Sequence, residues 1–171
     1  LVFVLSCILS LLSIDAHSEP AYTAQLWPLS DRLSQQTIYS VLQATDGTLW
    51  IATLAGIDRY NGVDFYEYRT NKMREGHIPS SQIFKIMETG TGEVYAATID
   101  SGLLLFHESE NRFEPVELHS NPNEHGSRLT AAYFSSAGDL WMGYESGDVV
   151  RYSPASGTVG SIRLNEGQQI T

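Results

Sequence analysis

The chain of 171 residues contains a single cysteine, Cys7, and few basic residues. Cys7 lies within an apolar run at the start of the chain, so the remainder has no thiol to form a disulfide, act as a nucleophile or bind a metal. Ten Lys and Arg stand against twenty Asp and Glu, which gives a net charge of −10 at pH 7. Because the basic residues are scattered and form no stripe, we expect no nucleic-acid partner. The acidity itself is typical of a protein kept soluble by its charge.

The apolar run at the start is too short to cross a membrane comfortably. It covers 1–14, whereas a transmembrane helix needs about 20 apolar residues. It breaks at Asp15 and is followed by the small-x-small triplet Ala16-His17-Ser18. We predict that 1–18 is a secretory signal peptide cleaved after Ala16 or Ser18, with an uncleaved membrane anchor as the alternative. Because the first residue is Leu and no basic segment precedes the run, we expect the sequence to be part of a longer protein.

Motifs for catalysis are also lacking. The sequence has neither a Gly-x-Ser-x-Gly nucleophile turn nor a phosphate-binding glycine loop. Two of the five histidines, His119 and His125, share one polar loop, but zinc sites use three or four ligands and no third ligand is fixed beside them. We therefore predict no catalytic residue, no metal site and no cofactor.

One short motif occurs three times, each time as a glycine followed by a polar, an aliphatic and an aromatic residue. The glycines of successive copies lie 45 and 46 residues apart. A repeat of this period is typical of stacked or radial folds, in which each repeat is one structural unit. The copies are Asp46-Gly47-Thr48-Leu49-Trp50, Thr91-Gly92-Glu93-Val94-Tyr95 and Ala137-Gly138-Asp139-Leu140-Trp141.

Each unit contains short apolar runs separated by turn residues. In the first unit, Asp46-Gly47 and Asn61-Gly62 are strong hairpin turns, because glycine accepts a positive φ angle. The runs that these turns separate are 37–44, 48–53, 57–60 and 63–69.

The first run of each unit is ambiguous when taken alone. Ile38, Val41 and Leu42 have helical spacing, as do Ile83 and Ile86 in the second unit. We predict strands nevertheless, because each run lasts only about eight residues before a glycine turn. Four-stranded units of this length make the blades of a propeller. The prediction is an all-β fold, an incomplete β-propeller with about three four-stranded blades, and a sandwich of meanders is the alternative.

These units divide the chain into six segments. Propellers have about four to eight blades, so three units cannot close a ring, and we expect the remaining blades of the same chain to be partners of this region. The predicted segments are 1–18, signal peptide; 19–32, linker and ring-closing strand; 33–76, blade 1; 77–127, blade 2; 128–167, blade 3; and 168–171, the start of blade 4.

The first unit closely resembles the two-component regulator propeller repeat. The resemblance rests on 33–41, 46–53 and 56–62, and it extends over roughly 33–152. The second unit departs from the pattern with Tyr95 for tryptophan and the third with Tyr144 for threonine, which weakens the assignment of each single repeat.

Proteins that look like this are bacterial membrane sensors. The resemblance implies a periplasmic propeller followed by a β-sandwich, a membrane helix and a cytoplasmic output domain, commonly a histidine kinase or a diguanylate cyclase. It implies a small-molecule or glycan signal as ligand, a homodimer at full length, and a location in the periplasmic region of an inner-membrane protein.

The candidate residues fall into two groups. Six repeat residues are expected to be structural, in turns and between blades: Gly47, Trp50, Gly92, Tyr95, Gly138 and Trp141. Six residues in or beside the polar connections between units are candidates for ligand binding, since binding groups concentrate on loops held by a rigid scaffold: Lys72, Arg74, His77, His119, His125 and Arg128. Two other functions remain open, a secreted propeller enzyme resembling a lyase and a non-catalytic interaction propeller.

Overall fold

The computed structural model describes residues 33, 35–70, 77–118 and 127–163, all of which belong to the compact unit Arg32–Thr171. The predicted signal peptide, the segment 19–32 and the predicted start of blade 4 lie outside the described residues. In the described part of the chain, no helix is long and apolar enough to cross a membrane.

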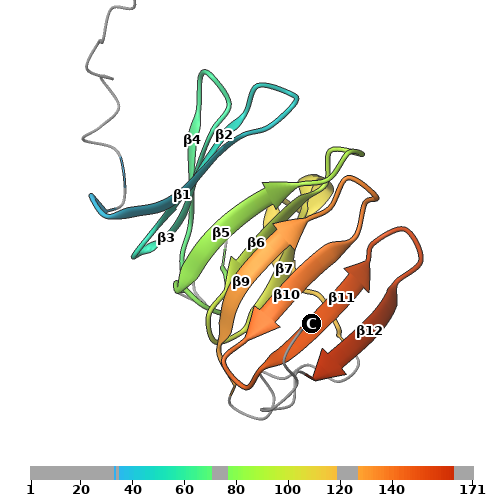
Figure 1. Ribbon diagram of the computed structural model, residues 1–171. Helices are drawn as coiled ribbons and strands as arrows, with labels where there is room; N and C mark the ends of the chain where they lie inside the picture. Colours follow the sequence, from blue (N-terminus) through green and yellow to red (C-terminus); the bar gives the residue numbers. More distant parts are fainter. Residues whose placement is uncertain (1–32, 34, 71–76, 119–126, 164–171) are drawn as a thin grey trace, which may run out of the picture. The chain divides into compact units, whose positions relative to one another are not determined.

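In the described residues, twelve strands form three four-stranded antiparallel sheets, each a meander in chain order (Figure 1). This confirms the predicted fold, an incomplete β-propeller with three blades. The first sheet contains β1 (Ile38–Gln43), β2 (Leu49–Thr53), β3 (Gly56–Tyr60) and β4 (Phe65–Tyr68). The second contains β5 (Ile83–Glu88), β6 (Val94–Thr98), β7 (Gly102–His107) and β8 (Arg112–Pro115). The third contains β9 (Leu129–Phe134), β10 (Leu140–Tyr144), β11 (Asp148–Ser153) and β12 (Thr158–Arg163).

The repeated glycines give the first turn of every sheet the same conformation. Gly47, Gly92 and Gly138 have φ angles of 87°, 89° and 85°, a region that residues with a Cβ rarely adopt. In each turn the glycine N–H donates to the carbonyl three residues earlier, over 2.9, 3.0 and 3.0 Å. The repeat motif therefore encodes a turn that reverses the chain between the first and second strands.

A β-bulge explains the helical spacing in the first strand of two sheets. The register of β1 shifts between Ile38 and Ser40, and that of β5 shifts between Ile83 and Lys85. An extra residue in a strand moves the alternation of side chains by one position. Apolar residues three apart, such as Ile38 and Val41, can then lie on the same face of a strand.

Two hydrophobic clusters hold the three sheets together. One cluster joins the first and second sheets, and Trp50 is 2 % exposed within it. The other joins the second and third sheets and includes Tyr95, which is 1 % exposed. Trp141 occupies the same repeat position but is only partly buried, on the face of the third sheet that points away from the second. The repeat aromatics of the first and second sheets thus face the next sheet along the chain.

Side chains also connect the first strands of neighbouring sheets. Strand β1 contacts β5, and β5 contacts β9. The N–H of Ile86 donates to Ser40 Oγ over 3.1 Å, and Lys85 Nζ donates to the carbonyl of Ala132 over 2.8 Å. These bonds satisfy backbone groups that an edge strand leaves without a ladder partner.

Candidate functional site

The two ends of each sheet differ in what joins the strands. One end, which we call the turn rim, carries the tight turns between the first and second and between the third and fourth strands. The other end, which we call the loop rim, carries the turns between the second and third strands and the segments that lead from one sheet to the next. Each end is a candidate site, because several units contribute side chains to it.

Two of the six predicted ligand-binding residues are described, and both lie on the loop rim. His77 forms a backbone bridge with Arg69, and its Nδ1 is buried without a hydrogen-bond partner. Arg128 is exposed, and its carbonyl accepts a hydrogen bond from the N–H of Glu145 over 2.9 Å. His77 precedes β5 and Arg128 precedes β9, so the fold places them on one rim but on different sheets. Lys72, Arg74, His119 and His125 lie outside the described residues.

The backbone of the loop rim is held by hydrogen bonds within the second unit and between the second and third units. The N–H of Ile99 donates to the carbonyl of Gln82 over 2.9 Å, and the N–H of Leu129 donates to the carbonyl of Ile99 over 3.0 Å. The side chain of Gln82 also donates to Asp100 over 3.1 Å. Gln82, Asp100 and Arg128 are exposed, so this rim presents polar side chains from a fixed backbone.

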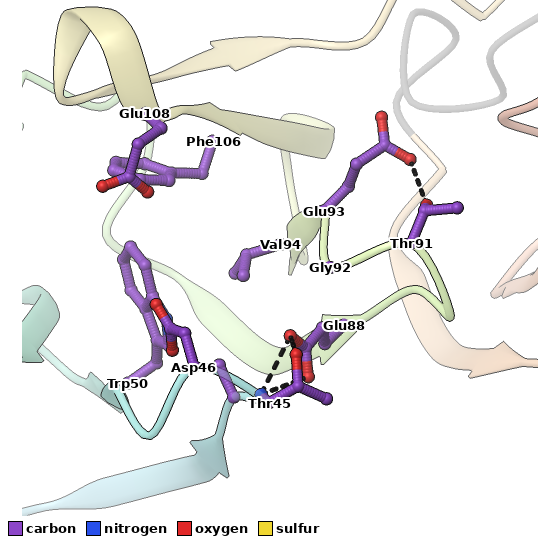
Figure 2. Close-up of a pocket in the computed structure, with 11 residues that line it drawn as sticks. Thr45, Asp46, Trp50, Glu88, Thr91, Gly92, Glu93, Val94, Phe106 and Glu108 are labelled. Atoms are coloured by element: carbon purple, nitrogen blue, oxygen red, sulfur yellow. Dashed lines mark hydrogen bonds between the residues drawn. The ribbon is translucent and has the colours of Figure 1, made fainter.

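On the turn rim, a cleft of about 280 Å³ opens between the first and second sheets (Figure 2). Four carboxylates line it, from Asp46, Glu88, Glu93 and Glu108. Each of the four carboxylates already accepts a hydrogen bond from another residue of the protein. These acidic groups therefore stabilise the scaffold. Asp46 accepts from the N–H of Thr48 (2.8 Å), Glu88 from the N–H and hydroxyl of Thr45 (2.9 and 2.7 Å), Glu93 from the hydroxyl of Thr91 (3.1 Å) and Glu108 from Arg59 (2.8 Å).

A second cleft occupies the equivalent place between the second and third sheets. Its volume is about 300 Å³, and Glu93, Phe134 and Pro154 are among the residues that line it. Both clefts lie between the first turns of two neighbouring sheets. A feature that recurs with the repeat follows from the way the sheets pack. The clefts therefore do not mark one dedicated binding site.

A buried arginine joins the first two sheets beside the first cleft. Arg59 is 8 % exposed, and its guanidinium carbon lies 5.1 Å from the ring centre of Trp50 and 5.0 Å from that of Phe106. One of its nitrogens donates to Glu108 over 2.8 Å. Sequence reasoning did not select Arg59. The recurring Arg-Tyr pairs at 59–60 and 151–152 are the signal that could have identified it.

Burial and neighbouring charges shift the pKa values of Arg59 and Tyr68, which lie between the first and second sheets. Burial alone would lower the pKa of Arg59, but its contacts with Glu108 and Tyr68 outweigh burial and raise it. Burial raises the pKa of Tyr68 to about 12, although Arg59 opposes the shift. The hydroxyl of Tyr68 donates to Asn111 over 2.6 Å, so it is held in its neutral form between the sheets. These groups serve the packing of the scaffold.

The described residues give no sign of a metal centre. Within them, no group of three or more His, Cys, Asp or Glu side chains could hold a metal ion. What the site offers chemically is hydrogen bonding from the loop rim and an acidic surface on the turn rim.

Comparison with known proteins places this fold among propellers. The sequence model of the two component regulator propeller family matches residues 32–55. None of the curated proteins matches the chain.

Three solved structures illustrate the likeness. The extracellular domain assigned to the hybrid two component system BT4673 of B. thetaiotaomicron is 22% identical, with a TM-score of 0.61 over 76% of this chain and 17% of its own. The corresponding domain of BT3049 from B. thetaiotaomicron is 19% identical, with a TM-score of 0.61 over 77% of this chain and 19% of its own. The β-propeller domain of Cps50 (Swd1) from Myceliophteria thermophila is 14% identical, with a TM-score of 0.53 over 76% of this chain and 42% of its own.

The chain therefore spans less than a fifth of the length of either extracellular domain. At these identities the structural likeness establishes the fold, and the match to the family model is confined to residues 32–55. The chain thus contains one segment that matches the two component regulator propeller family, within a fold of three propeller sheets.

Proposed function

We propose that the chain is the N-terminal part of the sensor propeller of a bacterial signal-transduction protein and that it faces the periplasm. The observation that carries the proposal is the regulator-propeller repeat at 32–55 on a chain that folds into three propeller sheets. The apolar segment and small-residue triplet of 1–18 support export. A membrane helix, a histidine kinase or diguanylate cyclase output and a full-length homodimer are part of the same proposal.

We place the signal-binding surface on the loop rim. The three first turns of the turn rim share one conformation and one hydrogen-bond pattern, as expected of a scaffold. The segments that join the sheets at the loop rim differ from each other in sequence, and the described residues beside them present exposed polar groups such as Gln82, Asp100 and Arg128. Binding groups concentrate on variable loops that a rigid scaffold holds in place.

The ligand class follows from charge and side-chain type. With a net charge of −10, the chain repels polyanions at long range, which disfavours large acidic ligands. Amide, carboxylate and guanidinium groups suit the hydroxyls of a sugar or the charged ends of an amino acid. A small neutral sugar or a free amino acid is therefore the proposed signal.

Isothermal titration calorimetry of the purified chain against a panel of monosaccharides, short glycans and amino acids tests this proposal. We expect one ligand class to bind and Arg128→Ala to weaken its binding about tenfold, which corresponds to about 1.4 kcal/mol. Arg112→Ala is the matched control, because Arg112 is also exposed but lies on the turn rim.

Two outcomes contradict the proposal. One is the absence of binding across the whole panel. The other is a ligand whose affinity falls with Arg112→Ala and is unchanged with Arg128→Ala, since that ligand would bind the turn rim. If nothing in the panel binds, a non-catalytic interaction propeller is the better account of the chain.

A further inference from the structure

The turn between β3 and β4 contains the only Asn-Gly pair of the sequence, Asn61-Gly62. All four residues of the turn, 61–64, are exposed, and Val63 is 81% exposed. The turn belongs to the turn rim and lies beyond the ends of its two strands, so its exposure does not depend on a sheet face being left open. Water therefore reaches this pair in the folded protein.

The side-chain amide of Asn61 is held against the backbone of its own turn. Its Oδ1 accepts hydrogen bonds from the N–H of Val63 over 3.0 Å and from the N–H of Asp64 over 2.7 Å. Asparagine at the start of a turn commonly bonds to the backbone two residues further on. Since both N–H groups follow Gly62, the side chain is folded back over the peptide bond that joins Asn61 to Gly62.

The backbone nitrogen of Gly62 is not engaged by any described residue. The neighbouring N–H groups of the turn all donate hydrogen bonds, but that of Gly62 donates none within the described part of the chain. Glycine also has no Cβ to hinder an approach to its nitrogen. The Asp46-Gly47 turn differs in this respect, because the N–H of Gly47 donates to the carbonyl of Ala44 over 2.9 Å.

We propose that Asn61 is a site of spontaneous deamidation in the folded protein. The Gly62 nitrogen attacks Cγ of Asn61, the bond between Cγ and Nδ2 breaks, and ammonia leaves with the proton of the Gly62 nitrogen. The product is a five-membered cyclic imide. Water then opens this ring at one of its two carbonyl carbons, which gives aspartate when the new bond to Cγ breaks and isoaspartate when the original peptide bond breaks.

The two hydrogen bonds to Oδ1 favour the first step. Negative charge develops on this oxygen when the nitrogen attacks Cγ, and N–H groups that already point at it stabilise that charge without reorganisation. The nucleophile and the amide carbon also belong to adjacent residues, so no entropy is lost in bringing them together. The turn therefore supplies a nucleophile, an electrophile and two donors for the developing oxyanion.

Asn111, the other asparagine among the described residues, lacks this arrangement. Its Oδ1 accepts a hydrogen bond from the hydroxyl of Tyr68 over 2.6 Å, so its side chain is directed to the neighbouring sheet. The residue that follows is Arg112, whose Cβ hinders an attack by its nitrogen. We expect Asn111 to remain unmodified under conditions in which Asn61 reacts.

Either product changes the turn rim. Each adds one negative charge to the net charge of −10. Isoaspartate also adds a methylene group to the main chain beside Gly62, whose carbonyl accepts a hydrogen bond from the hydroxyl of Tyr60 over 2.6 Å. Because this turn lies on the rim opposite the proposed ligand surface, the modification can be tested independently of the proposed function.

Incubation of the full chain at mildly alkaline pH tests the proposal. Ion-exchange chromatography separates the more acidic product, and peptide mass spectrometry locates the change from amide to acid. We expect the product to accumulate at Asn61 while the protein stays folded. Val63→Pro removes one N–H that donates to Oδ1 and should slow the reaction about fivefold, as the loss of one hydrogen bond predicts. Val63→Ala is the matched control, because it retains that N–H.

A second variant keeps the test independent of how Val63→Pro folds. Asp46→Asn creates another Asn-Gly pair in the same molecule, but one whose glycine nitrogen is engaged, and it should react at least about fivefold more slowly than Asn61. Far-UV circular dichroism confirms that each variant is folded. The proposal is overturned if Asn61 deamidates only after unfolding in urea, if Val63→Pro and Val63→Ala react at the same rate, or if position 46 of Asp46→Asn reacts as fast as Asn61.

Discussion

Trp50 and Trp141 occupy the same position in two repeats but differ in what covers them. Replacing each in turn by alanine removes the same side chain from the same position of two repeats. Trp50 is 2% exposed between the first and second sheets, whereas Trp141 is only partly buried, on the face of the third sheet that points away from the second. Any difference between the two substitutions therefore measures the contact between neighbouring sheets.

The expected magnitudes follow from the contacts. The ring of Trp50 lies 4.7 Å from that of Phe106, 5.6 Å from Phe113 and 6.0 Å from Tyr68, between ring centres. Removing a buried aromatic side chain of this kind costs about 3–5 kcal/mol of unfolding free energy. Trp141 lies 5.9 Å from the guanidinium of Arg151, a contact worth about 0.5–1 kcal/mol at an exposed site. We therefore expect Trp50→Ala to cost at least about 2 kcal/mol more than Trp141→Ala.

Urea unfolding measures both free energies. Far-UV circular dichroism is the appropriate signal, because each substitution removes one of the three tryptophans and changes the fluorescence. The protein is kept dilute, so that self-association contributes nothing to the apparent stability. Equal costs for the two variants, within about 0.5 kcal/mol, would refute the account of Trp50 as the centre of the contact between the sheets.

Three further predictions concern the region around Tyr68. Gly56→Ala should lower the free energy of unfolding by about 1–3 kcal/mol, because Gly56 has a φ of 137° and a Cβ there would lie 2.1 Å from the carbonyl oxygen of Tyr68. A Cβ at Gly90 meets no atom within 4 Å, so Gly90→Ala should be neutral. Urea unfolding compares the two variants. The pKa of Tyr68 is raised from 10.0 to about 12, so its neutral form is favoured in the folded state, and the stability it contributes is complete below pH 10 and is lost as the pH rises toward 12. Tyr68→Phe should flatten that part of a stability-against-pH profile, and an unchanged slope contradicts the assignment. Arg69→Met should lower the free energy of unfolding by about 3 kcal/mol, because it removes the cation that contacts the buried Asp58. Adding Asp58→Leu should recover most of that loss. A double variant that is no more stable in urea than the single variant contradicts this reasoning.

The repeat motif was enough to predict the fold. Gly47, Gly92 and Gly138 specify a turn that requires a positive φ, and this requirement can be read from single residues. The helical spacing of Ile38 and Val41 could have misled the prediction, because a bulge imitates it over a short run. The period of the repeat resolved the ambiguity. The length of each unit indicates four strands, even where one strand does not show a clear alternation of apolar and polar residues.

The contacts between sheets were beyond the reach of single-sequence reasoning. Arg59 pairs with Glu108, which lies 49 residues away, and Thr45 donates to Glu88 across 43 residues. Neither pair follows a fixed spacing that a motif could encode. The inter-unit residues proposed for ligand binding were chosen by their place between repeats, and that place identifies a rim of the fold without identifying the side chains that bind.

The buried ion pair of Arg69 and Asp58 is a feature of the first sheet that the second and third sheets lack. Arg69 donates to Asp58 over 2.6 Å, and Asp58 is 0% exposed. The equivalent positions of the second and third sheets hold Leu104 and Val150, so a buried charge is not needed to form this fold. A buried ion pair is seldom more stabilising than well-packed apolar residues, so stability alone does not account for it. Arg69 also donates to the carbonyls of Ile57 and Tyr68, over 2.9 and 3.0 Å, where the chain leaves β4 for the loop rim. The pair therefore fixes the backbone at the point where the chain leaves β4, and a ligand site on the loop rim, as proposed above, would need such a fixed support.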